Sequence, residues 1–123
     1  MEFDALSNRV IGCAIEVHRE LGPGLLESAY ERCLAYELTA AGIPFVSQQP
    51  IPVAYKGLDL ECGYRADIVV EGQLLVELKS VEELDGVHEA QVLTYMRLAK
   101  LPVSLLINFN VERLKDGIRR FVY

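Results

Sequence analysis

The chain has 123 residues, of which 51% are hydrophobic and 24% are charged. This composition is typical of a compact folded protein and excludes an intrinsically disordered chain, and the length predicts one domain over residues 1–123. The formal net charge is −6, which has the wrong sign for a protein that binds nucleic acid chiefly through a positive overall field.

Two helices are predicted before any strand. Apolar residues recur at helical spacing from about Asp4 to Leu21, where Gly22-Pro23-Gly24 ends the first helix. A second apolar stripe, from Leu26 to Ala41, predicts another helix that ends at Gly42.

Strands dominate the rest of the predicted order. The proline-containing stretch 43–55 favours an edge strand, and residues 56–59 favour a turn. Two apolar runs, 66–70 and 74–79, are separated by a three-residue loop and predict the central strands of a hairpin. The later elements are a helix over 87–100, a strand over 103–108, a turn at 115–117 and a strand over 118–122. The chain is therefore expected to form an α/β fold, with one layer of sheet flanked by helices.

The cysteines and the length of the apolar stretches indicate the cellular compartment. Cys13, Cys33 and Cys62 are odd in number and contain no CxxC pair, so neither a disulfide framework nor a structural zinc site is expected. No uncharged apolar stretch approaches the roughly 20 residues that span a bilayer, and the first residues lack the basic region of a signal peptide. We therefore expect a cytoplasmic protein that does not associate with membranes.

Two carboxylates are predicted to face each other in the central hairpin. If the residues that flank its loop pair, Asp67 lies opposite Glu77 and Arg65 lies opposite Lys79, all on one face. Facing like charges destabilise a hairpin, and a divalent cation such as Mg²⁺ or Mn²⁺ would relieve the repulsion. Lys79 could then stabilise charge that develops on phosphorus. The alternative is a solvated face on which Lys79 pairs with the acids.

Further polar residues lie at helical spacing on the flanking helices. Glu27 and Tyr30 share one face of the second helix. Glu27 either completes a metal site or is an acid stabilised by the positive end of the helix dipole. Tyr30 alone is typical of a core residue. Gln91 and Tyr95 also share a face and could contact a phosphate or a base, while His88 is either a general base or a structural residue.

Several motifs in order resemble the bacterial GxxExxY family. The matching blocks are residues 17–30, 49–53, 64–67, 76–79, 88–91, 105–109 and 114–118. That family is grouped with the PD-(D/E)XK nuclease superfamily, so the resemblance implies a restriction-endonuclease-like core with a mixed central sheet flanked by helices.

The resemblance also implies a site, residue by residue. The metal-binding and catalytic positions match Glu27, Asp67, Glu77 and Lys79, of which the three acids would hold the metal. The substrate-binding positions expected beside them are Gln91, Tyr95, Tyr30 and His88. Gln91 and Tyr95 resemble the QxxxY motif of the exonuclease-like branch, and Ala66 stands where the superfamily name has proline.

The expected function is a Mg²⁺-dependent (or Mn²⁺-dependent) nuclease that hydrolyses the phosphodiester bonds of DNA or of another nucleic acid, as a monomer or homodimer. The alternative is an inactive module with the nuclease fold that binds nucleic acid or a partner protein. Basic residues near the C-terminus could follow a phosphate backbone in that case, although an ordinary solvated edge strand explains them better. These residues are Arg113, Lys115, Arg119 and Arg120.

Overall fold

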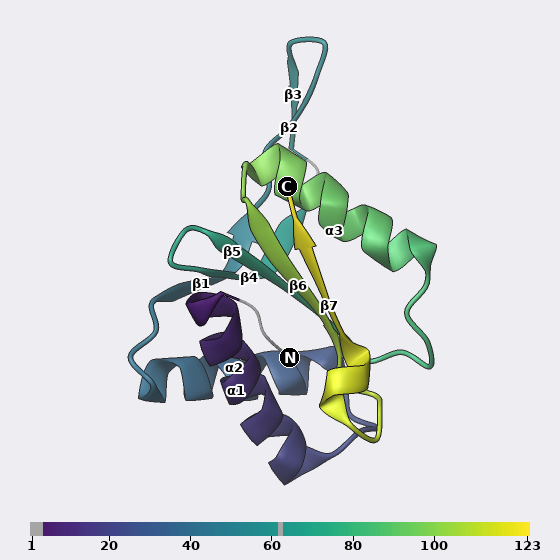
Figure 1. The fold of residues 1–123 in the computed structure, drawn as a ribbon. Coiled ribbons are helices and arrows are strands. Elements are labelled where there is room, and N and C mark those ends of the chain that lie inside the picture. The colour runs from purple at the N-terminus through teal and green to yellow at the C-terminus, as the bar shows by residue number, and fades with distance from the viewer. Residues whose placement is uncertain (1–3, 62) are drawn as a thin grey trace.

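The computed structural model describes residues 4–61 and 63–123, and it shows a twisted sheet with helices on both faces (Figure 1). The helices are α1 (Ala5–Leu21), α2 (Glu27–Ala40), α3 (Gly86–Ala99) and the short 3-10 helix η1 (Leu114–Gly117). The strands are β1 (Phe45–Pro50), β2 (Val53–Tyr55), β3 (Leu58–Leu60), β4 (Arg65–Val70), β5 (Leu74–Lys79), β6 (Val103–Asn108) and β7 (Ile118–Val122).

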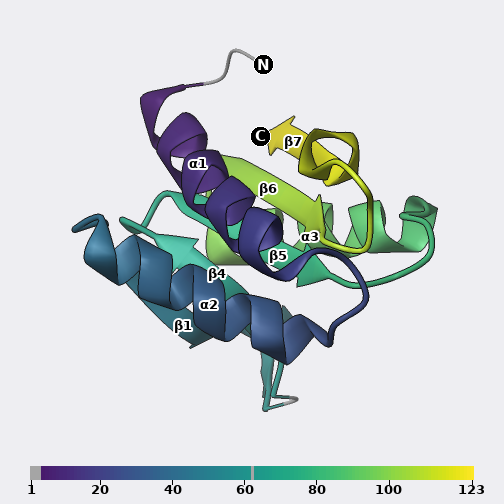
Figure 2. The same cartoon turned by 90° about the horizontal axis from the view of Figure 1, so that it is seen from below.

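The main sheet has five strands in the order β1-β4-β5-β6-β7. Strands β5 and β6 are parallel, and the other neighbours are antiparallel. A parallel pair needs a crossover connection, which α3 provides on one face, while α1 and α2 cover the other (Figure 2). The expected α/β fold with a mixed sheet flanked by helices is therefore confirmed.

Each face of the sheet has its own hydrophobic core. Val76 and Leu78 of β5 belong to the core beneath α1 and α2. Leu75 belongs to the core beneath α3, together with Val92 and Met96 of that helix. Because side chains alternate along a strand, the next position of β5 on the α3 side falls to residue 77.

The glycines predicted to end α1 and α2 do so, and α1 also has a capping residue at its start. Asp4 caps α1, since its side chain accepts a hydrogen bond from the Ser7 amide at 3.0 Å. Gly22 ends α1 with a φ of 68°, and Gly42 follows α2 with a φ of 72°. Within the described ranges, no helix combines the length and apolar character that crossing a bilayer requires.

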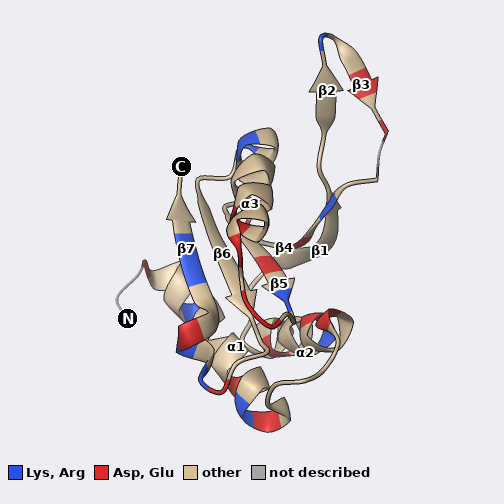
Figure 3. Ribbon diagram, turned by 90° about the vertical axis from the view of Figure 1, so that its right-hand side faces the viewer, with Lys and Arg blue, Asp and Glu red and all other residues tan. Residues whose placement is uncertain are grey.

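Strands β2 and β3 form a separate two-stranded hairpin that stands away from the rest of the protein (Figure 3). The sequence predicted one edge strand over 43–55 and a turn over 56–59. The single continuous strand is wrong, because the stretch divides into β1 of the main sheet and β2 of the hairpin. The cause is Pro52, which has no N–H to continue the ladder beyond β1, so the chain leaves the sheet. The hairpin turns at Lys56-Gly57, and the edge position of β1 is as predicted.

The cysteines that can be compared with the prediction are free thiols. Cys13 and Cys33 are half-buried and pack against the core beneath α1 and α2. Cys62 lies outside the described residues, so its expected state stays a prediction.

Candidate active site

Asp67 and Glu77 lie side by side where the pairing of β4 with β5 ends. The predicted register holds from Val70 opposite Leu74 to Ile68 opposite Val76, and the ladder stops there. Beyond the ladder, side-chain carboxylates accept hydrogen bonds from the backbone amides of the facing strand. Glu77 Oε1 accepts the Asp67 amide at 3.1 Å, and Asp67 Oδ2 accepts the Leu78 amide at 2.8 Å. Each carboxylate is thus fixed by the backbone of the opposite strand.

The sheet is irregular around Asp67, and this corrects one predicted pairing. The β4–β5 ladder ends at Ile68 opposite Val76, so the predicted pairing of Arg65 with Lys79 is wrong. On their other sides, Arg65 pairs with β1 and Lys79 pairs with β6. In the β1–β4 ladder the register skips Asp67 and the facing Gln48, whose φ is 54°. Asp67 is therefore absent from both ladders, and its amide donates to the Glu77 side chain instead.

Glu77 is a carboxyl group in an environment that disfavours its charge. Its side chain is buried, with 4% exposed. Burial is the largest cause that raises the pKa of Glu77, to about 9, and the negative charge of Asp67 is the next. A side-chain hydrogen bond with Asp67 raises it further, while Lys79 acts in the opposite direction. Without a cation, the Glu77 carboxyl therefore keeps its proton at neutral pH.

A polar chain runs from Lys79 to α3. The Lys79 ammonium donates to Gln91 Oε1 at 3.2 Å, and Gln91 Nε2 donates to the Tyr95 hydroxyl at 3.4 Å. Burial, and then the charge of Glu77, raises the pKa of Tyr95. In Figure 3, β5 carries an acidic and a basic segment at its end, beside α2. The structure thus brings Lys79, Gln91 and Tyr95 to the same side of the sheet as Glu77.

Glu27 is the first residue of α2 and is exposed. The loop before it is tied to the end of β5, because Ser80 Oγ donates to the Leu25 carbonyl at 2.5 Å. This bond holds the start of α2 next to the strand that carries Glu77 and Lys79.

Glu31 is an acid near the site that the sequence reasoning missed. Burial is the largest cause that raises its pKa; Gln48 lowers it, and the charges of Asp67 and Glu27 raise it. Gln48 Nε2 donates to both carboxylate oxygens of Glu31, at 2.8 and 3.1 Å. Glu31 therefore lies close enough to Asp67 and Glu27 to interact with their charges. The available signal was its spacing, one helical turn after Glu27.

The donor set partly fits a divalent cation. Across residues 4–61 and 63–123, no three Asp, Glu, His or Cys side chains lie close enough together to hold a metal ion. The expected set of Glu27, Asp67 and Glu77 is therefore not assembled in this conformation. Two adjacent carboxylates nevertheless suit Mg²⁺, which retains several waters and needs only one or two protein carboxylates. The place of Glu27 among the ligands stays a prediction.

Tyr30 does not line the site, which corrects the expectation that it contacts substrate. Its side chain is fully buried and stacks on Phe109 with the ring centres 4.5 Å apart. Its hydroxyl donates to the Gly22 carbonyl at 2.6 Å and accepts the Leu25 amide at 3.1 Å. Tyr30 therefore fixes the loop between α1 and α2 from the hydrophobic core.

His88 has a structural role at the start of α3. Its Nδ1 accepts the Asp85 amide at 3.1 Å, and the Asp85 carboxylate accepts the His88 amide at 3.3 Å. This reciprocal pair is a capping box. A contact of His88 with substrate stays a prediction.

The basic residues near the C-terminus are largely engaged with acids. The ion pairs are Arg113 with Asp116 at 4.0 Å, Arg119 with Glu89, and Arg120 with Asp4 at 2.7 Å. Lys115 is exposed on η1. Because three of the four basic residues are paired with acids, an ordinary edge strand explains them better than a surface that binds a phosphate backbone.

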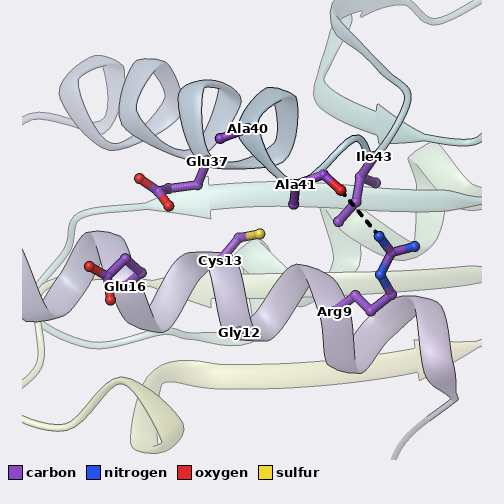
Figure 4. Close-up of a pocket in the computed structure, with 8 residues that line it drawn as sticks. All are labelled: Arg9, Gly12, Cys13, Glu16, Glu37, Ala40, Ala41 and Ile43. Atoms are coloured by element: carbon purple, nitrogen blue, oxygen red, sulfur yellow. Dashed lines mark hydrogen bonds between the residues drawn. The ribbon is translucent and has the colours of Figure 1, made fainter.

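A hollow of about 430 Å³ between α1 and α2 shares no residue with this site (Figure 4). Arg9 reaches across it to donate to the Ala41 carbonyl at 3.4 Å. Burial, and then the charge of Glu37, raises the pKa of the Cys13 thiol that faces it. Because the thiolate is the reactive form, the hollow offers no activated nucleophile.

Comparison with known proteins agrees with the fold. A family model described as the PD-(D/E)XK nuclease superfamily matches residues 4–121. No curated protein and no solved structure matches the chain.

Proposed function

Because the chain belongs to the PD-(D/E)XK nuclease superfamily, we propose that it hydrolyses phosphodiester bonds of DNA at Asp67, Glu77 and Lys79. The observation that carries this proposal is the contact between the two acids. Each accepts a backbone amide of the opposite strand, at 3.1 and 2.8 Å. Lys79 follows two positions after Glu77 on the same face.

The two carboxylates are the proposed holders of a divalent cation, Mg²⁺ or Mn²⁺. Their oxygens are hard ligands for such a cation. Its positive charge would offset both the repulsion between the two carboxylates and the cost of burying them. When bound, such a cation supplies Lewis acidity toward a phosphate oxygen. We propose Glu27 as a further ligand, since the loop before it is tied to the end of β5.

Lys79 is the proposed stabiliser of negative charge on the reacting phosphate. An ammonium group aimed at developing charge in a partly buried site lowers the barrier more than it would in water. Gln91 accepts a hydrogen bond from this ammonium at 3.2 Å, which limits the directions in which the lysine can point. Gln91 and Tyr95 are therefore proposed to contact the substrate from α3, on the side where Lys79 lies.

Within the superfamily, we assign the chain to the GxxExxY group. The assignment is supported by the spacing of Gly24, Glu27 and Tyr30 and by the ordered blocks that follow them. In this chain the tyrosine of that motif supports the loop before α2. Both the buried ring of Tyr30 and its hydroxyl group take part in this support.

A cleavage assay tests the proposal. Purified protein is incubated with labelled single- and double-stranded DNA in Mg²⁺ or Mn²⁺, with chelator as the blank. Lys79→Ala is expected to lower the rate by about 10²-fold or more, because one preorganised donor to developing charge contributes on this scale. Lys115→Ala is the matched control, since this exposed lysine lies on η1. Equal rates for the wild type and Lys79→Ala would remove the assigned role.

A non-catalytic module with the nuclease fold is the second candidate. It is favoured by the absence of an assembled three-ligand metal group in the described residues and by the net charge of −6. A module of this kind would bind a partner protein or a nucleic acid, and its binding to DNA would be the same with and without divalent cation. The enzyme proposal instead requires cleavage that stops when the cation is removed.

A further inference from the structure

We propose that a cavity between α3 and the base of the β2–β3 hairpin receives one unpaired nucleobase of the substrate. The inference rests on the proposed nuclease function and narrows the substrate class to single strands or frayed ends. The cavity has a volume of about 420 Å³. It is lined by Val53, Tyr64, Val87, Ala90, Gln91, Thr94, Tyr95 and Leu98.

The lining of this cavity suits a flat, uncharged and largely apolar group. None of its lining residues is charged. Tyr64 and Tyr95 meet edge to face, with ring centres 6.4 Å apart and an interplanar angle of 62°. A planar base can stack on an exposed tyrosine ring, and the Thr94 hydroxyl and Gln91 amide supply polar groups for its edge. A phosphate or a metal ion would find no charge complement there.

The cavity shares two residues with the polar chain of the proposed catalytic site. Gln91 and Tyr95 line it and also form the polar chain that ends at Lys79, with Gln91 Oε1 accepting the lysine ammonium at 3.2 Å. A strand that places one phosphate at Lys79 therefore carries a neighbouring base toward the cavity. A base within a duplex is paired and stacked, so only an unpaired or extruded base can enter.

The residues that would contact the base are accessible and held in place. Tyr64 is 48% exposed and Val87 is 76% exposed, so both can gain contact area with a ligand. The Tyr64 carbonyl accepts the Ile51 amide at 2.9 Å, which anchors this side of the cavity to the chain leaving β1. In Figure 1 the hairpin rises next to α3, and residues of β2 and of α3 both line the cavity.

Binding to matched oligonucleotides tests the inference. Fluorescence anisotropy is measured in Ca²⁺, which takes the same oxygen ligands as Mg²⁺. The probes are a labelled single-stranded oligodeoxynucleotide and an abasic oligomer of the same length, which keeps every phosphate and lacks every base. Tyr64→Ala should weaken binding of the first probe by roughly 5- to 100-fold, the range typical of losing one stacked base. Binding of the abasic oligomer should not change.

Two variants control for effects other than stacking. Tyr64→Phe keeps the ring and should retain most of the affinity. Tyr36→Ala removes a tyrosine that is 70% exposed on α2, outside the cavity, and should leave affinity unchanged. An affinity of Tyr64→Ala equal to that of the wild type overturns the inference, as does an equal loss on both probes. A labelled apolar peptide that binds wild type in a Tyr64-dependent way, with no binding of the oligonucleotide, overturns it as well.

The outcome for this cavity is separable from the outcome for catalysis. If cleavage depends on Lys79 and Tyr64→Ala changes neither cleavage nor oligonucleotide binding, the base pocket is rejected. The proposed nuclease activity is then retained. Base-dependent binding through Tyr64 without any cleavage supports the pocket and rejects the enzyme.

Discussion

Replacing Glu77 with glutamine should stabilise the metal-free protein more at alkaline pH than at acidic pH. The buried carboxyl has a pKa of about 9, compared with 4.5 for the free group, because burial and the charge of Asp67 disfavour its ionised form. Between these two values the folded protein holds a proton that the unfolded chain releases. The stability from Glu77 is therefore fully present below pH 4.5 and is lost as pH rises through about 9.

The size of this effect follows from the linkage relation. One bound proton of difference changes the free energy of unfolding by about 1.4 kcal/mol per pH unit. From about pH 5 to about pH 8 the wild type should thus lose on the order of 4 kcal/mol that Glu77→Gln retains. The glutamine can still accept the Asp67 amide through Oε1, so the contact that fixes β4 to β5 is kept.

Urea denaturation in chelator, at several pH values, measures the difference. Glu20→Gln is the matched control, because it removes one negative charge from an exposed position on α1. The control should follow the pH dependence of the wild type. If the curves of wild type and Glu77→Gln stay parallel from acidic to alkaline pH, Glu77 is not a carboxyl destabilised by burial and by Asp67, and the reasoning is refuted.

Other predictions concern residues that hold the framework of the site. Tyr30→Phe removes the hydroxyl that bridges two backbone groups of the loop before α2 and should cost about 1–3 kcal/mol in urea denaturation. Asp4→Ala should cost about 1 kcal/mol at neutral pH through loss of the α1 cap. Its backbone and side-chain bonds to Ser7 lower the pKa of Asp4 from 3.8 to about 2, so this cost should fade as pH drops through that range. Gly117→Ala should destabilise by about 1–3 kcal/mol or more, since its Cβ would lie 2.2 Å from the Asn108 carbonyl oxygen.

A glycine on α1 provides the control for the last of these. A Cβ at Gly12 would meet no atom within 4 Å, so Gly12→Ala should be neutral or stabilise by up to about 1 kcal/mol through helix propensity. Thermal denaturation of both variants compares them directly. Similar losses for Gly117→Ala and Gly12→Ala would contradict the steric explanation, and an undiminished stability of Tyr30→Phe would contradict the role given to its hydroxyl.

The sequence predicted the part of the site that depends on strand periodicity. Alternation in residues 74–79 placed Glu77 and Lys79 on one face, and opposite faces of β5 do pack into different cores. The three-residue loop after β4 also predicted the register correctly as far as Ile68 opposite Val76. These features are local, because a short loop and a period of two determine them without knowledge of the rest of the fold.

The features that the sequence did not predict depend on distant contacts. Tyr30 shares a helical face with Glu27, yet its hydroxyl is buried against the loop before α2, and only the packing on Phe109 reveals this. The proximity of Glu31 to Asp67 requires knowing how α2 crosses the sheet. The β2–β3 hairpin was hidden because its strands are short and follow Pro52, a residue that usually ends a strand.

Calorimetric titration with Mg²⁺ and Mn²⁺ tests the central claim most directly, namely that the pair of Asp67 and Glu77 holds a divalent cation. The wild type should bind with a saturable heat, Glu77→Gln should lose that binding, and the control Glu20→Gln should retain it. A parallel titration of Glu27→Gln reports whether the acid on α2 is also a ligand. Equal binding by wild type and Glu77→Gln, or no binding by the wild type, would contradict the account.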